Sequence, residues 1–319
     1  RLHVRTYLSS RNHNNAWVKG GYLQIDDLPM FGSPAFMDNL RIRAGHFMPN
    51  YGDTHFRRTD NADAIQNPFV GNNVLDAFTT EVGAEATYMS NGFLVVGGFG
   101  GALDPTVTNP DERAPSFHAK LGFDRNLNDM LRLRLTGSVY YTASSLAAHL
   151  HSGDRAGSRY YNVVGGGAWS GRIRSGFTDQ VTSFMLNPFV KIGGLELFGT
   201  IETISGTGPG ISQDLGKDEG TLTQYAAEAV YRFADEDLFL GVRYNTMDGA
   251  LDHSGYGQAP NWSTGNTVDR WQVSAGWFMT ENLMVKAEYV TQSYEGFPTG
   301  NARNGAEFDG LIIEGIVSF

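Results

Sequence analysis

The chain has 319 residues with 40 Gly, 12% aromatic residues, no Cys and a formal net charge of −10, and its mean hydropathy is −0.29. The lack of Cys excludes disulfides and Cys-ligated metals. The longest nearly apolar run, residues 93–103, includes four Gly, and it is about half as long as the roughly twenty apolar residues of a spanning helix. A lipid-spanning barrel of strands is compatible with this composition, because its strands alternate lipid-facing and water-facing side chains.

Fourteen segments alternate apolar and polar residues with the period of two that is typical of β-strands. In one of them, Leu131, Leu133 and Leu135 face one way, whereas Arg132 and Arg134 face the other. One face suits lipid and the other suits water. The predicted strands are residues 1–8, 15–26, 39–48, 80–89, 92–101, 116–124, 129–142, 181–193, 194–205, 221–233, 237–247, 269–279, 283–294 and 306–319.

The connections between these segments alternate between short turns and long loops. The short turns are residues 90–91, 125–128, 193–194, 234–236 and 280–282, and the long loops are residues 49–79, 102–115, 143–180, 206–220, 248–268 and 295–305. Outer-membrane barrels have short periplasmic turns and long extracellular loops. The sequence therefore predicts a single domain, residues 1–319, that is all-β and forms a transmembrane antiparallel up-and-down β-barrel of about 14 strands. Residues 27–38 are an exception, because they are long for a periplasmic turn.

A soluble all-β sandwich or barrel also contains alternating strands. Fourteen strands in series would need several soluble domains, yet no linker-like break in composition divides the chain. Aromatic residues gather near the ends of the apolar faces, as in the interfacial girdle of a membrane barrel. They are Tyr88, Phe123, Tyr141, Tyr225, Phe233, Trp271 and Tyr289. Both observations favour a barrel in the outer membrane of a Gram-negative-type bacterium. The alternation of short and long connections then predicts that both chain ends are on the periplasmic side.

The last predicted strand has apolar residues or Gly at every second position from Leu311 to the terminal Phe319. This pattern resembles the final strand of bacterial outer-membrane proteins, which the barrel assembly machinery recognises. The resemblance implies that Phe319 is an assembly signal. We expect the strand at Arg1, or one shortly upstream, to pair with residues 306–319 and close the barrel. If N-terminal strands are missing from this sequence, an added pair would raise the strand number to 16.

A second resemblance covers residues 40–52, LRIRAGHFMPNYG, which are similar to a strand and the turn after it in the phosphate-selective porin family. In that family the following segment tends to fold toward the lumen, and selectivity depends on Arg and Lys that project into a narrow passage. The resemblance implies a pore-constricting loop at residues 49–79. Arg57 and Arg58 are the candidates in this loop.

The water-facing side of the predicted wall carries twelve basic and eight acidic residues. Such a wall favours small anions, although salt screens the effect over a Debye length of roughly 8 Å. Arg1, Arg5, Arg41 and Arg43 have few acids nearby, which predicts an unpaired basic strip. The alternative is that inward Arg and Glu residues pair and brace the wall. The candidate pore-lining residues are Arg41, Arg43, Arg57, Arg58, Arg132 and Arg134.

Two loop stretches place hydrolase residue types side by side: residues 151–154 contain His, Ser and Asp, and residues 252–254 are Asp-His-Ser. Both lie in predicted extracellular loops, and adjacency in sequence is not the geometry of a catalytic triad. Residues 206–210 lack the Lys and Ser/Thr of a phosphate-binding loop, and the Asp-rich stretches match no defined calcium loop. We therefore expect no catalytic residue, no metal site and no cofactor.

The expected function is passive diffusion of small hydrophilic solutes through an outer-membrane porin, with phosphate-like anions preferred. The alternative is a structural or scaffold barrel that anchors a partner protein, and residues 143–180 could be its docking surface or a lid over a pore. An outer-membrane enzyme is disfavoured, because the predicted lipid-facing positions are nearly all apolar. The expected partners are outer-membrane lipids, the barrel assembly machinery, small anions or other small solutes, and further copies of the chain or a partner protein. No nucleic acid is expected.

Overall fold

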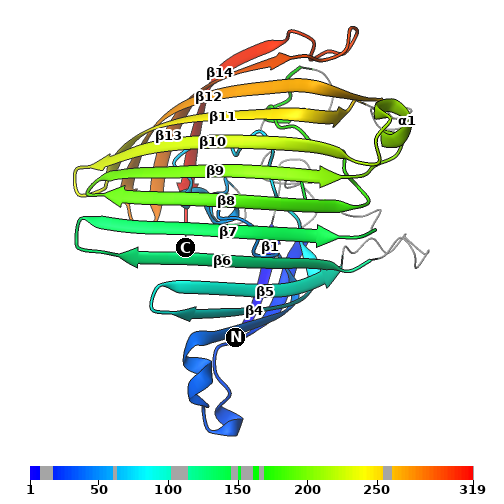
Figure 1. Ribbon diagram of the computed structural model, residues 1–319. Coiled ribbons are helices and arrows are strands. Elements are labelled where there is room, and N and C mark those ends of the chain that lie inside the picture. The colour runs from blue at the N-terminus through cyan, green and yellow to red at the C-terminus, as the bar shows by residue number, and fades with distance from the viewer. Residues whose placement is uncertain are drawn as a thin grey trace.

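The computed structural model describes residues 1–7, 17–59, 63–101, 114–144, 150–151, 161–164, 169–253 and 261–318. In this part of the chain, fourteen strands form one antiparallel sheet in which each strand pairs with its neighbour in sequence (Figure 1). Each strand corresponds to a predicted one, so the predicted up-and-down topology is confirmed. The strands are β1 (Leu2–Tyr7), β2 (Trp17–Ile25), β3 (Leu40–Phe47), β4 (Glu81–Ser90), β5 (Phe93–Gly101), β6 (Ser116–Asn126), β7 (Leu131–Thr142), β8 (Val181–Ile192), β9 (Leu195–Gly206), β10 (Gly220–Phe233), β11 (Leu238–Asp252), β12 (Trp262–Thr280), β13 (Leu283–Glu295) and β14 (Glu307–Val317).

Several strands are longer than the segments in which apolar and polar residues alternate, and they extend into the long connections. β12 begins at Trp262, seven residues before the predicted start, and pairs with β11 past a register shift between Gly249 and Leu251. Ladder hydrogen bonds join backbone groups, so pairing continues where the side chains no longer alternate. The helices among the described residues are short. They are the 3₁₀-helices η1 (Pro29–Phe31), η2 (Ala35–Asn39), η3 (Thr54–Arg57) and η4 (Ala64–Gln66), and the α-helix α1 (Ile211–Leu215).

The two faces of the sheet reverse the usual arrangement of a soluble protein. On β6 the adjacent residues Lys120 and Leu121 are 1% and 64% exposed. On β7 the predicted faces are confirmed, because Thr136 is buried among polar groups while Leu135 is 49% exposed. Exposed apolar side chains on so many neighbouring strands form a contiguous surface that is unfavourable in water. The outer face therefore suits lipid, and the polar groups point inward.

The short connections lie together at one end of the sheet, which we call the short-turn end, and the long ones lie at the other, the long-loop end (Figure 1). Asn91 and Gly92 join β4 to β5 with φ of 51° and 85°, which is the two-residue turn with both φ positive that suits a twisted hairpin. A Cβ on Gly92 would lie 2.8 Å from the carbonyl oxygen of Asp124. Gly is therefore required there by conformation and by space.

The predicted pairing between the first and last strands is not formed among the described residues. There, β1 pairs with β2 and β14 pairs with β13, and Phe319 lies outside the described residues. The sheet curls round, with β1 behind β5 to β7 in Figure 1. Closure depends on the tilt and stagger that accumulate over all strands, so no local pattern at Arg1 or at residues 306–318 specifies it.

Candidate pore-lining site

Residues 49–79, of which 60–62 are not described, leave β3 and cross the inner face of the sheet; we call them the inner segment. The segment first contacts β7, β8 and β9. The Gly52 amide donates to Ser138 Oγ at 3.0 Å, and the Asp53 amide donates to Asn187 Oδ1 at 2.8 Å. The Tyr51 hydroxyl donates to Glu202 at 2.9 Å. Inward polar side chains of the wall thus hold the start of the segment.

The later part of the inner segment is held by the opposite wall, mainly through its backbone. Glu288 Oε2 on β13 accepts the amides of Val70 and Gly71 at 2.7 and 3.1 Å. Arg243 on β11 donates to the Gly71 carbonyl at 2.5 Å, and Arg270 on β12 donates to the Asn72 carbonyl at 2.9 Å. The segment therefore spans the space between two sides of the wall.

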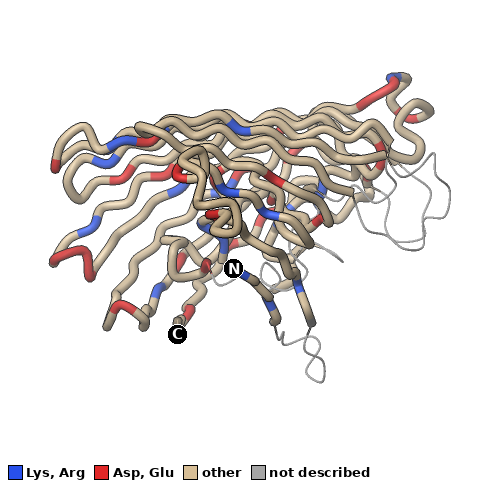
Figure 2. The backbone as a smooth tube through the Cα atoms, turned by 90° about the horizontal axis from the view of Figure 1, so that it is seen from below, with Lys and Arg blue, Asp and Glu red and all other residues tan. Residues whose placement is uncertain are grey.

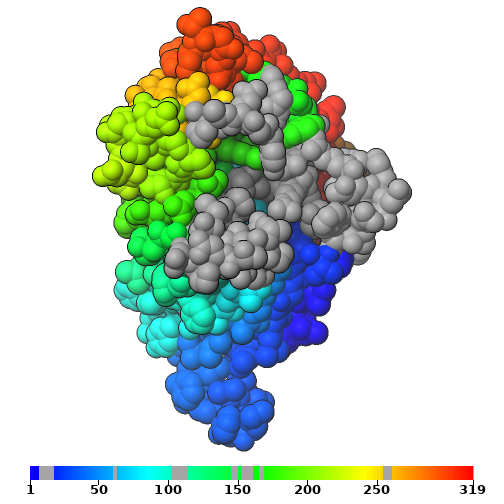
Figure 3. Space-filling model, turned by 90° about the vertical axis from the view of Figure 1, so that its right-hand side faces the viewer, coloured from blue at the N-terminus to red at the C-terminus, as the bar shows by residue number. Residues whose placement is uncertain are grey.

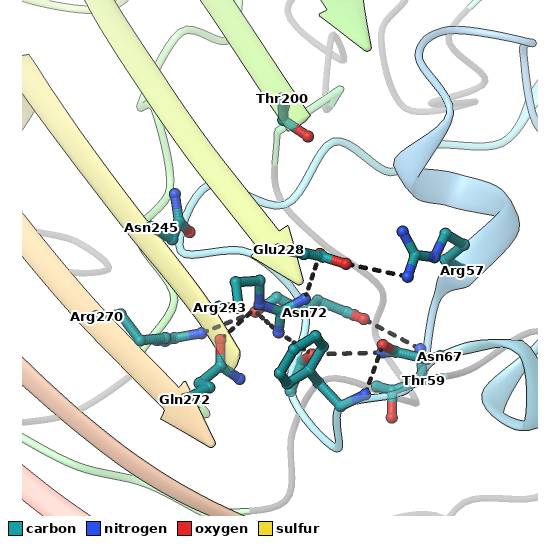
Figure 4. A network of polar contacts seen from close by, with 12 residues as sticks. Arg57, Thr59, Asn67, Asn72, Thr200, Glu228, Arg243, Asn245, Arg270 and Gln272 are labelled. Carbon is teal, nitrogen blue, oxygen red and sulfur yellow. Dashed lines mark hydrogen bonds and ion pairs between the residues drawn. The ribbon is translucent and has the colours of Figure 1, made fainter. Parts of the chain in front are cut away.

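One polar network connects the contacts around residues 70–72 with the earlier part of the inner segment. Glu228 on β10 accepts a hydrogen bond from Arg243 at 3.1 Å and forms an ion pair with Arg57 of the inner segment at 3.0 Å. Figure 4 shows Arg57 and Arg243 converging on Glu228, with Gln272 and Arg270 beyond. Ionic contacts as well as backbone hydrogen bonds therefore hold the inner segment.

The long-loop half of the interior contains an apolar cluster. Val74 and Leu75 of the inner segment pack there with Ile173 and Phe177 from the β7–β8 connection, and Leu75 forms an isolated parallel bridge with Ile173. The wall contributes apolar inward residues at this level: Ile204, Leu222, Met247, Val268 and Tyr294. The interior is thus mainly apolar at the long-loop end. Toward the short-turn end, charged groups lie beside a second, smaller apolar cluster of Phe69, Val230, Phe239 and Met284.

A cavity of about 560 Å³ opens inside the barrel toward the short-turn end, and we call it the arginine cavity. Its lining includes six arginines and two carboxylates. They are Arg5, Arg41, Arg43, Arg57, Arg132, Arg134, Asp53 and Glu85. Five of the six arginines proposed from sequence are thus brought together. Figure 2 shows Lys and Arg beside Asp and Glu on neighbouring strands toward this end, at the left.

Arg58, the sixth arginine proposed from the sequence, does not line the arginine cavity. Its side chain is 2% exposed, forms an ion pair with the Asp76 carboxylate, and stacks on the Phe78 ring at 4.6 Å. Burial raises the pKa of Asp76, but the charge and hydrogen bonds of Arg58 outweigh it and leave the pKa below its ordinary value. Arg58 thus links two parts of the inner segment.

The predicted unpaired strip is wrong for three of its four members. Arg1 and Arg41 both approach Asp26, with N–O distances of 3.8 and 2.7 Å, and Arg43 contacts Glu85 at 2.5 Å. Arg5 alone forms no ion pair with a described residue. The alternative of paired and braced charges describes the wall better.

The same bracing holds for the arginines of β7. Arg132 contacts Asp124 at 2.7 Å, and Arg134 contacts both Asp124 and Asp53. The pairing of Arg43 with Glu85 has a signal in the sequence, because the apolar–polar alternation of their strands places both on the inward face. They are directly opposite in the β3–β4 register. For Asp53 there was no local signal.

Asp53 is the centre of a buried ionic cluster. Its carboxylate lies 2.5 Å from Lys120 Nζ and 2.8 Å from Arg134 Nε, and it accepts a hydrogen bond from Thr136. Burial raises the pKa of Asp53, but Arg134 and Lys120 outweigh burial, and the pKa falls well below its ordinary value. Nearby, burial lowers the pKa of His55 to about 3.

The two hydrolase-like stretches acquire no triad geometry in the described residues. His151 is buried and contacts Glu202 at 2.9 Å, and His253 contacts Ser263 at 2.6 Å. Residues 152–154 and 254 lie outside the described residues. Both described histidines thus bind neighbouring strands.

No family model matches the sequence, and no curated protein matches it significantly. In-vitro folded OmpT, an outer membrane protein of Vibrio cholerae, has a similar structure with a TM-score of 0.53 and 13% identity, covering 95% of this chain and 81% of OmpT. The fold is that of an outer-membrane β-barrel.

The trimer form of OmpT gives a TM-score of 0.52 at the same identity, covering 95% of this chain and 80% of that chain. At 13% identity the likeness concerns the fold. Among the described residues, no helix has both the length and the apolar character needed to cross a membrane. The exposed apolar faces of the strands provide the lipid-facing surface.

Proposed function

We propose that the protein is an outer-membrane channel for passive diffusion of small hydrophilic solutes, with a modest preference for phosphate-sized anions. The observation that carries this proposal is the arginine cavity, where six guanidinium groups and two carboxylates line one space. Fixed cationic groups lower the energy of an anion and raise that of a cation. The proposed function is not enzymatic.

The preference is expected to be modest, because acids just outside the lining pair with several of these arginines. They are Asp26, Asp124 and Glu228. Arg5 is exposed and has no such partner among the described residues, so its charge is the least compensated in this part of the chain. At an effective dielectric of about 80, two unit charges about 4 Å apart interact by about 1 kcal/mol before salt screening, which corresponds to a several-fold bias.

We further propose that the inner segment constricts the channel. Contacts to both sides of the wall support this role, because they hold residues 52–59 and 63–75 across the lumen. Arg57 would then place a positive charge at the constriction, since it lies in the inner segment and lines the arginine cavity.

The test is the reversal potential of purified protein in a planar bilayer under a salt gradient. Wild type is expected to show the sign of an anion-selective channel, and Arg5→Glu with Arg132→Glu is expected to shift the potential toward cation selectivity. Arg125→Glu is the matched control, because Arg125 is exposed at the end of β6 and does not line the cavity. A cation-selective wild type would contradict the electrostatic assignment.

A structural barrel that anchors a partner is the second candidate, and the apolar cluster at the long-loop end favours it. Val74, Leu75, Ile173 and Phe177 occupy space that water fills in an open pore. The same bilayer experiment separates the two functions. A folded barrel without any conductance would support the anchor and reject the channel.

A further inference from the structure

Residues 27–39 include the connection 27–38, which is long for a periplasmic turn, and project away from the sheet at the short-turn end. They form η1 and η2 and extend beyond the outline of the barrel in both Figure 1 and Figure 3. Met30, Phe31 and Phe36 are 82%, 70% and 60% exposed. Three large apolar side chains displayed on one small projection need a partner that is less polar than water.

The projection is held in shape by its own hydrogen bonds. The Asp27 carboxylate accepts from the Leu28 amide at 2.7 Å and from the Ser33 hydroxyl at 2.8 Å. The amides of Phe31 and Gly32 donate to the carbonyls of Leu28 and Pro29. Internal pairing of backbone groups is what a segment needs where it contacts acyl chains, because no water is there to bind them.

The projection is continuous with the lipid-facing surface of the barrel. The outward residue Leu23 on β2 is 48% exposed just before it, and Tyr88 on β4 is 45% exposed beside Leu40, where β3 starts after it. Met37 is 3% exposed, so η2 has a buried side as well as an exposed one. The apolar surface thus extends from the strands onto the projection, with the exposed acids Asp27 and Asp38 at its two ends.

We propose that residues 28–36 lie in the periplasmic leaflet of the outer membrane and anchor this end of the barrel at the boundary between headgroups and acyl chains. Residues 28–36 carry no charged side chain, and the acids Asp27 and Asp38 lie on either side of them. Apolar burial rather than attraction to anionic headgroups therefore drives the contact. This inference depends on the barrel fold and not on the proposed channel function.

The absence of Cys makes a clean test available, because single Cys residues can be labelled selectively. Met30→Cys and Phe36→Cys are labelled with the environment-sensitive fluorophore NBD and reconstituted in phosphatidylcholine vesicles with or without brominated lipid. Leu121→Cys on the lipid-facing side of β6 is the positive control, and Glu281→Cys in the exposed β12–β13 turn is the negative control. Retained heat-modifiable migration on gels verifies that each variant is folded.

Brominated lipid is expected to quench labels at 30 and 36 to within about two-fold of the label at 121, and addition of anionic lipid is expected to leave the quenching unchanged. Quenching as weak as at position 281 would overturn the proposal. Blue-shifted emission that resists brominated lipid but changes when labelled protein is diluted with unlabelled protein would assign the projection to a second copy of the chain, and would also overturn it.

Discussion

At the scale of single residues, the charged side chains of the interior act mainly in pairs. Asp53 illustrates this, because it is 6% exposed and is stabilised as an anion by Lys120 and Arg134. Removing one partner of such a buried cluster leaves an uncompensated charge. The arrangement explains how a lumen can be rich in charge and still be well ordered.

His55 provides a pH-dependent prediction at this scale. Its folded pKa of about 3 is below the ordinary 6.5, because the ring is buried, lies near Lys120 and Arg43, and is only partly compensated by Asp53 and by the Tyr51 carbonyl. The neutral ring therefore favours the docked inner segment. This contribution is complete above about pH 6.5 and is lost as the pH falls toward 3.

Acidification from pH 7 to pH 4 is thus expected to loosen the segment and to increase current fluctuations in single-channel recordings. His55→Gln should reduce the pH dependence, while His253→Gln, at the long-loop end, should leave it unchanged. Equal pH dependence in wild type and His55→Gln would exclude His55 as the group responsible.

At the scale of elements, the inner segment is positioned by side chains that bind its backbone. Glu288 accepts two amides, and Arg243 and Arg270 donate to carbonyls of the same turn. A Cβ on Gly71 would lie 2.9 Å from Gln272 Nε2, so the wall and the segment are in close contact. The segment thus depends on the wall for its position.

Replacing Glu288 by Ala is expected to release this turn, because two buried amides lose their acceptor and each unsatisfied group costs about 1–3 kcal/mol. Hydrogen exchange at residues 70–75 should accelerate by at least about ten-fold, and mean conductance should rise. Glu295→Ala at the exposed end of the same strand is the control. Unchanged exchange in Glu288→Ala would show that the remaining contacts suffice.

At the scale of the whole molecule, the barrel has an apolar outer face that suits lipid and an interior that the inner segment crosses. The strands are joined in chain order, so assembly needs no crossing connections. Recognition of the last strand is the step for which the sequence makes a specific prediction.

Deletion of Phe319 is expected to lower the yield of folded barrel in the outer membrane several-fold, because the terminal aromatic residue of the assembly signal is lost. Heat-modifiable migration of membrane fractions measures the yield. Ser318→Ala, which retains the terminal Phe, should assemble normally. Undiminished yield after the deletion would reject the signal.

The sequence alone determined the strands, their two faces and the alternation of short and long connections. These follow because successive residues of a strand face lipid and the interior in turn, so the polarity of each residue indicates its face, as at Leu121, Leu135 and Thr136. It also indicated which arginines face inward. The boundaries of β12 were missed, because backbone pairing continues beyond the alternating pattern.

Only the tertiary structure decided which acid pairs with each arginine, where the inner segment runs and what fills the long-loop half. The Leu75 amide binds Gln224, 149 residues away, and the Val70 amide binds Glu288, 218 residues away. Backbone amides are the same at every residue except Pro, so these contacts leave no signature in the sequence. They are decided by the curvature of the sheet, which brings distant strands to face one another across the interior.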